Sequence, residues 1–474
     1  MASSGADSSP ATRLDAAEPP TNVRWVILLL LMLMTAMFHF NRNSINVAGA
    51  EHIIKNPERE INDYDVSATQ MGLVYTSYLI IYTVMMVPGG WLIERIGPKG
   101  ALLFLGFGFA VFVPVTGLVG YWLPPGSHTM AGSLLGLPMI VVALCAIRGL
   151  LGVFGAPMHP GAARAVSYWL PYGSRGLGNG LVTGAAVVGA ALTPPIFGFL
   201  SDRHFFGDDS GWRSALVVAG IVTGLLTLVW AFYGADRPAR HSLVNASERR
   251  GIEAGDPAIG VPVQLAGSAA TGFWSMLIEK NMILLNLSYA AYSYSQYLFF
   301  NWAQYYITNT LHYSVQDSRL WTTGITLSMA AGMLFGGLSA DRMQAIFGSR
   351  RGRAITPLCG MTISGLLLML AVFSPWPLGS IVGFGLSMAM LGLCEASFWT
   401  TALEIGKDRA ALSGSILNAG GNAGGLLAPT FTPLLSLYLG WQGSLALAGG
   451  ISMLGGLFWI WIHLQEAHPS VREL

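Results

Sequence analysis

Two arginines lie inside long apolar stretches of this chain, where a positive charge needs a partner. Arg42 follows an apolar run that begins near Trp25, and Arg148 lies in another between Leu134 and Ala156. A charge inside a bilayer costs about 2.5–3.5 kcal/mol on insertion scales and normally faces a cavity or a partner. Neither arginine has an acidic residue within one helical turn of its own stretch. Both are available to a ligand carboxylate, which a guanidinium holds through two parallel hydrogen bonds. The alternative is a structural hydrogen bond to carbonyls of another helix.

Glu395 is the acidic counterpart of these arginines. It lies in an apolar stretch 247 residues after Arg148, and the same offset relates other segments of the chain. Such an acid can form a gating ion pair with the arginine, bind a proton, or belong to a permanent structural pair, and the residues leave these three alternatives open. Trp399, one helical turn after Glu395, could contact a sugar-sized ligand or face lipid.

Other polar side chains in apolar stretches could bind hydroxyl groups of a ligand. Gln296 lies among several tyrosines in the stretch 281–306, and Asn418 and Asn422 lie one turn apart on one helix face. Tyr82 is a further candidate. The alternative for the asparagines is a hydrogen bond between closely packed, glycine-rich helices.

The elements that must position these residues are membrane-spanning helices. The chain has 474 residues, of which 53% are hydrophobic and 10% charged, whereas a soluble protein carries about 25% charged residues. A spanning helix needs about 20 mainly apolar residues. Twelve stretches meet this requirement: roughly 25–48, 70–93, 100–122, 134–156, 179–200, 213–234, 281–306, 319–340, 354–374, 379–402, 412–437 and 443–464.

A repeated turn divides the spans into two sets of six. After the second span, Gly90 is followed by Glu94 and Arg95. After the eighth span, an equivalent turn carries Asp341 and Arg342. Internal repeats of this length are typical of transporters in which two bundles rock about a central site.

Positive charge in the loops predicts the orientation of the chain. Lys and Arg are concentrated on the side of both termini, which predicts that both termini are cytoplasmic. The first span is too long for a signal-peptide core and is expected to be retained. The predicted organisation is a disordered tail (1–22), a first six-helix bundle (23–234), a linker (235–280), a second six-helix bundle (281–465) and a short tail (466–474).

The sequence gives no support to several other classes of protein. It has no phosphate-binding loop, nucleophile elbow or His-Glu-x-x-His motif, and no soluble region large enough for catalysis. Its three cysteines lack metal-ligand spacing, and its net charge of +1 gives no field for nucleic acid. We expect no enzyme activity, no cofactor, no metal site and no nucleic-acid partner. The expected partners are an anionic substrate and membrane lipid, bound by a monomer.

The repeat and its turns resemble the major facilitator superfamily. Residues 90–99 are similar to its signature G-x-L-x-D-R-x-G-x-K, with Glu94 in place of Asp. The resemblance implies an all-α membrane protein of major facilitator fold, with twelve transmembrane helices in two pseudo-symmetric six-helix bundles and alternating access. The acid and arginine of each turn are then expected to latch the cytoplasmic ends in one state and release them in the other. Glu404, near a helix end, is expected to join this latch.

Three stretches resemble a narrower group, the anion:cation symporter family. Residues 41–48 are similar to D-R-x-x-[IL]-x-V-A, and residues 148–157 to R-x-x-x-G-x-x-E-A-P. Tyr82 precedes a Pro-Gly-Gly as in Y-x-x-x-Q-x-P-G-G, with Met86 at the Gln position. The family carries sugar acids such as galactonate, glucarate and hexuronates. The resemblance implies a cell-membrane carrier of a sugar acid or related carboxylate. Alternatives are an exchanger or facilitator of sugar phosphates or organic anions, an efflux carrier of a neutral metabolite or drug, and a membrane nutrient sensor.

Two residues depart from that family. The acid before Arg42 is Asn41, and the glutamate of the second arginine motif is Gly155. Those acids are the expected proton carriers of such symporters, so simple proton coupling is in question. If the chain is a proton symporter, Glu395 is predicted to carry the coupling proton, with His39 second because histidine titrates near physiological pH. The coupling ion stays open, and facilitated diffusion or exchange is the alternative.

Overall fold

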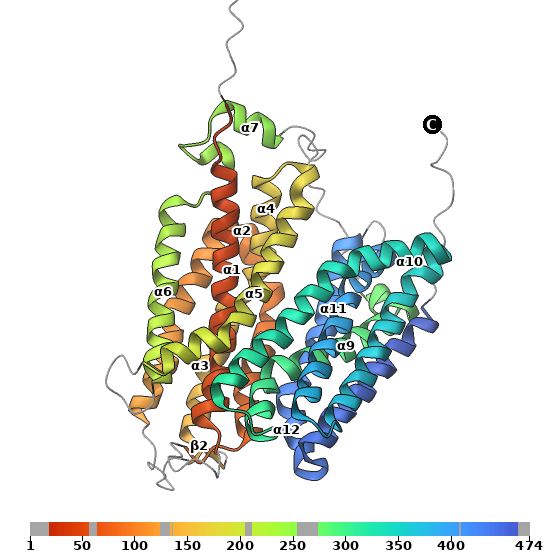
Figure 1. The fold of residues 1–474 in the computed structure, drawn as a ribbon. Helices are drawn as coiled ribbons and strands as arrows, with labels where there is room; N and C mark the ends of the chain where they lie inside the picture. The colour runs from red at the N-terminus through yellow and green to blue at the C-terminus, as the bar shows by residue number, and fades with distance from the viewer. Residues whose placement is uncertain are drawn as a thin grey trace, which may run out of the picture.

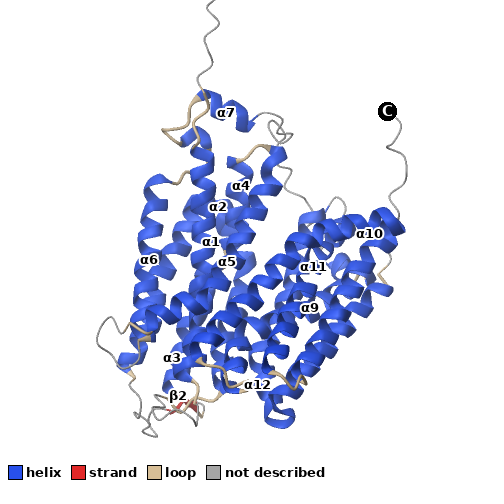
Figure 2. Ribbon diagram, viewed as in Figure 1, coloured by secondary structure: helices blue, strands red, loops and turns tan. Residues whose placement is uncertain are grey.

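The computed structural model describes residues 19–55, 64–123, 133–134, 136–203, 211–253, 274–406 and 409–462. Nearly all of the described chain is helical, and a short two-stranded sheet lies at one end of the molecule (Figure 2). The elements are α1 (Val23–Ala48), the π-helical turn η1 (Gly49–Ile53), α2 (Ala68–Trp122), β1 (Ser133–Leu134), β2 (Leu137–Pro138), α3 (Met139–Gly155), α4 (Met158–Trp169), α5 (Arg175–Ser201), α6 (Trp212–Tyr233), α7 (Ala246–Glu253), α9 (Lys280–Asn309), α10 (Val315–Val372), α11 (Pro377–Gly406) and α12 (Ala410–Leu457). Short 3-10 turns are η3 (Tyr172–Ser174), η4 (Pro238–Arg240) and η6 (Phe458–Ile460).

Three long helices each contain two crossings that meet at a glycine. The turning residues are Gly97 in α2, Gly348 in α10 and Gly440 in α12, with φ angles of 76°, 82° and 68°. Positive φ is inexpensive only for glycine, so these residues let the chain reverse within a short turn. Gly97 and Gly348 belong to the two repeated turns found in the sequence.

The described helices confirm the twelve predicted spans. Nine stretches are long and apolar enough to cross a membrane, and two of them, Ala68–Trp122 and Leu412–Ile460, contain two crossings each. The more polar α9 is the twelfth crossing. The boundaries differ from those predicted. Span four was expected at 134–156 but continues through α4, and span eight was expected at 319–340 but extends over Val315–Gly348. Hydropathy finds only the lipid-facing length of a helix, so the polar helix ends were missed.

Side-chain caps start three of these helices. The Ser67 hydroxyl accepts a hydrogen bond from the Gln70 backbone N–H, and the Gln70 side-chain oxygen accepts one from the Ser67 backbone N–H. These two bonds form a capping box at the start of α2. Ser314 caps α10, and the Glu279 carboxylate accepts from the backbone N–H at the start of α9. These caps satisfy N–H groups that have no partner within the helix.

The helices form two bundles, α1–α6 and α9–α12, that lean apart toward the end carrying α7 (Figure 1). Each bundle has its own hydrophobic core. At the opposite end the bundles meet closely. Gly72 of α2 lies against the Pro429 carbonyl, the Thr76 and Thr430 hydroxyls are 2.8 Å apart, and the rings of Tyr75 and Trp302 pack 5.5 Å apart.

Parts of the predicted tails and linker lie outside the described residues, namely 1–18, 254–273 and 463–474. Within the linker, α7 packs back on the start of α1, because the buried Glu248 carboxylate accepts from the Arg24 backbone N–H at 3.0 Å. The domain boundaries stay predictions.

Candidate functional site

Arg42 and Arg148 lie at one cavity between the two bundles. The first comes from α1 and the second from α3. Residues of α9 in the second bundle complete the walls. The lining residues are Arg42, Asn43, Asn46, Tyr75, Tyr78, Leu79, Arg148, Tyr297, Phe300 and Asn301.

The Arg42 guanidinium is held by aromatic side chains. One of its N–H groups donates to the Tyr297 hydroxyl at 2.8 Å, which links the first bundle to the second. The guanidinium carbon lies 5.2 Å from the ring centre of Tyr78, 5.8 Å from that of Tyr82 and 5.1 Å from that of Tyr297. Ring faces attract a cation without neutralising its charge. Tyr82 therefore contacts the predicted anion ligand Arg42, although it does not line the cavity.

Arg148 is more deeply placed, with 3% of its surface exposed. It donates one hydrogen bond to the Arg42 carbonyl at 2.7 Å, and its guanidinium lies 5.0 Å from the Tyr78 ring centre. The carbonyl contact considered in the sequence analysis therefore forms. Its Nε, however, is buried with no hydrogen-bond partner among the described residues.

Neither arginine forms an ion pair with a carboxylate in the described part of the chain. Buried charges are ordinarily paired, because an uncompensated charge loses its hydration. Two unpaired guanidiniums at one cavity therefore supply what a bound anion needs: positive charge, several N–H donors and little competition from water.

A second cavity continues from the first toward the end where the bundles meet. The two cavities share Asn43, Asn46, Phe300 and Asn301. The second also reaches Gln304 of α9. The Gln304 amide in turn donates to the Glu51 carboxylate, so the cavities end at a charged network.

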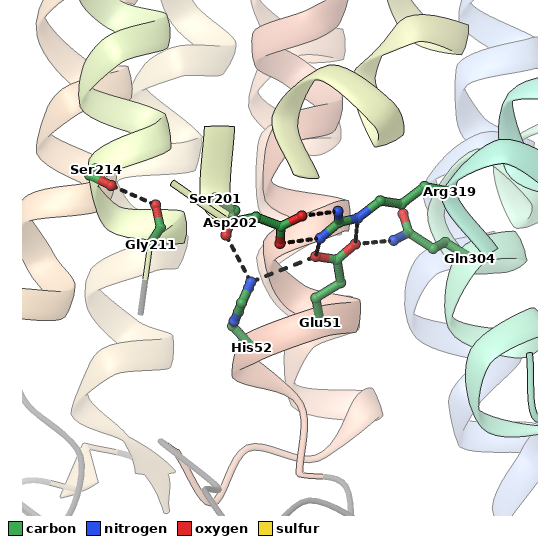
Figure 3. A network of polar contacts seen from close by, with 8 residues as sticks. All are labelled: Glu51, His52, Ser201, Asp202, Gly211, Ser214, Gln304 and Arg319. Carbon is green, nitrogen blue, oxygen red and sulfur yellow. Dashed lines mark hydrogen bonds and ion pairs between the residues drawn. The ribbon is translucent and has the colours of Figure 1, made fainter. Parts of the chain in front are cut away.

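That network joins the two bundles through Arg319 (Figure 3). Arg319 of α10 donates to both oxygens of Glu51 at 2.7 Å and to both oxygens of Asp202 at 2.6 and 2.9 Å. Glu51 and Arg319 are each 5% exposed. The His52 ring lies 3.6 Å from Glu51 and 2.9 Å from the Ser201 hydroxyl. Two bidentate pairs on one guanidinium close this end of the molecule.

The predicted latch lies at the other end, where the bundles diverge. Glu94 and Arg95 are exposed, and the Arg95 guanidinium stacks 5.0 Å from the Trp91 ring centre. Gly90 is partly exposed with open space around it, and Arg342 is exposed.

The rest of the predicted latch gives one ion pair. Glu404 of α11 pairs with Arg353 of α10, which joins two helices of the same bundle rather than the two bundles. The Asp341 side chain lies outside the described part of the structure. The latch itself stays a prediction.

The predicted residues of the second bundle do not line the arginine cavity. Gln296 donates to the Met329 sulfur at 3.6 Å, which directs it toward α10. The amides of Asn418 and Asn422 lie 3.8 and 3.4 Å from the sulfur of Met86, the residue at the family's glutamine position. The two asparagines therefore contact α2 of the first bundle.

Glu395 and Trp399 contact each other rather than Arg148. The Glu395 carboxylate accepts hydrogen bonds from the Trp399 indole at 2.8 Å and from the Tyr289 hydroxyl at 3.0 Å. The Arg148–Glu395 ion pair considered in the sequence analysis is wrong for this conformation. Donors within its own bundle reach one oxygen, Oε1, whereas Oε2 is buried with no hydrogen-bond partner among the described residues.

His39 faces a second histidine that sequence reasoning did not select. Its Nε2 lies 3.3 Å from Nε2 of His159, which belongs to α4. Both rings are half-buried. Such a contact requires one ring to donate an N–H to the other.

Several site residues were missed although the sequence carried a signal for them. Tyr75 and Tyr78 recur at helical spacing with the predicted Tyr82 and form one face of α2, and Asn46 lies one turn beyond Arg42. An exposed aromatic stripe on a lipid-facing helix would have the same pattern. The spacing gave no means of assigning this stripe to the cavity.

The fold and this site define a class: a polytopic membrane transporter, not an enzyme. The sequence profile described as Major Facilitator Superfamily matches residues 31–414 and 285–474. The chain therefore belongs to the major facilitator superfamily.

Relatives of known name cover most of the chain. It is 26% identical to a probable sulfoacetate transporter of Cupriavidus necator, over 86% of each chain. It is also 26% identical to a probable galactarate/D-glucarate transporter of Bacillus subtilis, over 88% of this chain and 86% of the relative. A D-galactonate transporter of Escherichia coli is 23% identical over 94% of this chain and 96% of its own.

Solved structures share the fold. A bacterial homologue of the human lysosomal transporter Spinster, described as inward-facing, aligns with a TM-score of 0.72 and 16% identity over 94% of this chain and 100% of its own. The inward-open xylose transporter of Escherichia coli aligns with a TM-score of 0.68 and 15% identity over 94% of this chain and 98% of its own. At these identities the likeness concerns the fold alone.

Proposed function

We propose that this chain carries a small organic anion across the cell membrane, with the acid group of the substrate bound by Arg42 and Arg148. The observation that carries the proposal is their position at one interbundle cavity without a carboxylate partner among the described residues. A neutral substrate would leave both charges uncompensated in this buried place.

The substrate class follows from the rest of the cavity and from the relatives. Asn43, Asn46 and Asn301 offer amides and Tyr75 offers a hydroxyl, which suit the hydroxyl groups of a sugar acid. The named substrates of the relatives are hydroxylated carboxylates or a sulfonated carboxylate, and all are small acids. We propose a sugar acid or a related carboxylate as the substrate.

Alternating access supplies the transport step. The Arg319 network closes one end of the molecule while the bundles lean apart at the end that carries α7 (Figure 1). The concentration of Lys and Arg on the side of the termini supports a cytoplasmic location for the α7 end. This conformation is then inward-facing. In the outward-facing state the Arg319 network is broken and the turns at Glu94 and Asp341 come together.

Uptake into proteoliposomes tests the proposal. Radiolabelled D-galactonate, D-glucarate, sulfoacetate, glucose 6-phosphate and the neutral galactitol would each be exchanged against the same unlabelled compound. We expect exchange of at least one carboxylate, no exchange of galactitol, and loss of exchange in Arg42→Gln and Arg148→Gln. Exchange of glucose 6-phosphate alone would move the substrate class to sugar phosphates. Normal exchange in both arginine variants would refute the anion site.

An uncoupled exchanger or facilitator is the second candidate. Asn41 donates to the Thr223 hydroxyl at 2.7 Å and Gly155 has no side chain, so neither family position provides an acid. Concentrative uptake driven only by an imposed pH gradient distinguishes a proton symporter from an uncoupled carrier, because an uncoupled carrier cannot concentrate its substrate.

A further inference from the structure

A pair of histidines lies beside the arginine site and has no role in anion binding. The Nε2 atoms of His39 and His159 face each other at 3.3 Å, and their ring centres are 5.4 Å apart. One ring comes from α1 and the other from the first turn of α4. Phe38 packs edge-on against both rings at 5.1 and 6.3 Å, which helps to fix their orientation.

The pair occupies the helices on which the two family acids are absent. His39 lies two residues before Asn41 on α1, and His159 lies four residues after Gly155, about one turn further along the same span. The two spans that carry Asn41 and Gly155 therefore hold two side chains that can bind protons.

Positions 155 and 41 offer no proton-binding side chain to the cavity. A Cβ atom at Gly155 would lie 2.8 Å from the Tyr78 hydroxyl and 3.0 Å from the Phe38 ring, so no glutamate fits there without displacing both. Asn41 is fully buried and directs its amide toward Thr223 of α6, away from the cavity lining.

We propose that the His39–His159 pair binds the proton that drives anion uptake. This inference rests on the proposed function and deepens it. In the neutral pair, one ring donates its Nε2 proton to Nε2 of the other. Addition of one proton to the free Nδ1 of the donor ring forms one N–H bond and breaks none. It gives an imidazolium whose Nε2–H still donates to the neutral ring, so the pair gains one positive charge.

Arg42 connects this proton to the substrate. It lies three residues after His39, on the same side of α1, and its charge acts on both rings. A bound anion offsets this charge and removes repulsion that a protonated pair would experience. The proton in turn strengthens the field that holds the anion. This reciprocity is what a symporter requires.

The charged and polar groups on the neighbouring helices do not replace the two histidines as the group that titrates. Arg148 faces Arg42 from α3, and Tyr78 of α2 lies against both guanidiniums. Thr223 of α6 accepts a hydrogen bond from Asn41, two residues after His39. The α5 segment Arg175–Ser201 contains no acidic residue and no histidine. Within the described structure, no carboxylate forms an ion pair with the pair or with Arg42.

Proton-driven accumulation of D-galactonate in proteoliposomes tests the pair. For a monovalent acid carried with one proton, a gradient of about one pH unit supports about tenfold accumulation. In His39→Gln and His159→Gln we expect accumulation to fall to about onefold while exchange stays measurable. Glutamine keeps a hydrogen-bonding amide near Nε2 but binds no proton. His312→Gln, at an exposed histidine of the α9–α10 turn, is the matched control and is expected to retain the gradient-driven accumulation.

Two outcomes of this assay overturn the proposal. One is full accumulation in both histidine variants. The other is accumulation that depends on Glu395 alone, lost in Glu395→Gln and kept in the histidine variants. Absence of D-galactonate exchange in every protein would instead count against the proposed substrate, and the pair is then decided by a measurement that needs no transport.

That measurement is a pH titration of protein labelled with ¹⁵N-histidine, followed by NMR. We expect the signals of His39 and His159, assigned by their loss in the two variants, to change together with uptake of one proton. Each variant should abolish the coupled change of the remaining ring. Signals of the two rings that titrate independently, or that do not change over the pH range of the titration, would overturn the proposal without reference to any substrate.

Discussion

Removal of the Arg319 charge should shift the conformational equilibrium strongly toward the state open at the Arg319 end. In the conformation described, Arg319 is 5% exposed and its guanidinium makes four hydrogen bonds of 2.6–2.9 Å to Glu51 and Asp202. Loss of one partner from a buried ion pair costs about 3–5 kcal/mol because a charge is left uncompensated. In the opposite state, water replaces the lost contacts.

A cost of about 3 kcal/mol in one state alone corresponds to a shift of more than about a hundredfold in the equilibrium. Arg319→Met is the perturbation. Spin labels at exposed Trp122 and Gln316, one at this end of each bundle, report their separation by double electron–electron resonance in protein whose native cysteines are replaced. We expect a longer distance population to become dominant.

The exposed pair of Lys55 and Asp65 gives the control. Their side chains are 56% and 65% exposed, so Asp65→Asn should cost less than about 1 kcal/mol and leave the distances unchanged. The double variant Glu51→Gln/Arg319→Met should shift the conformational equilibrium less than Arg319→Met does. It also removes the Glu51 charge, which Arg319→Met alone leaves buried without its partner. Distances in Arg319→Met that match those of the unmodified protein would refute the closure role of this network.

Three further substitutions test particular contacts. A methyl group at Gly198 would meet the Arg319 guanidinium, so Gly198→Ala should lengthen the same spin-label distances, whereas Gly184→Ala on the same helix has open space and should not. Arg148→Lys keeps the charge but loses the forked geometry, and anion affinity should fall at least about tenfold in a binding titration. Gly155→Ala overpacks its site by about 1–3 kcal/mol, so the protein should melt at lower temperature, again against Gly184→Ala, and equal melting would contradict the packing argument.

The twelve spans could be predicted because lipid imposes a strong rule on composition. An apolar run of about 20 residues has few alternatives to a membrane helix. The repeated turns that carry Glu94 and Asp341 indicated the two bundles. The α4 part of span four and the ends of span eight were missed, because beyond the hydrocarbon the rule no longer applies.

The site could be predicted in part for the same reason. Arg42 and Arg148 were selected because a charge in an apolar span is costly, and the structure brings both to one cavity. Contacts between bundles had no such signal. Glu51 and Arg319 lie at the ends of spans, where charges are common, and only the packing of η1 against α10 buries them together.

Polar residues on the second bundle were harder to place. Asn418 and Asn422 were predicted to share a helix face, and they do lie together, 3.5 Å apart. Which neighbour that face meets depends on how the bundles pack and on their conformational state. The helical period predicts neither the packing of the bundles nor their conformational state, so the contact of the two asparagines with Met86 could not be predicted.

The most direct test of the anion site is the affinity of the purified protein for its transported acid, measured by calorimetry. Loss of one charge-assisted hydrogen-bonding partner costs about 1.5–3 kcal/mol, so Arg42→Gln and Arg148→Gln should each weaken binding by about tenfold to a hundredfold. Arg164→Gln removes an exposed arginine that bonds Tyr168 of the same helix, and its affinity should stay within about twofold of the unmodified protein. Unchanged affinity in both cavity variants would contradict the account.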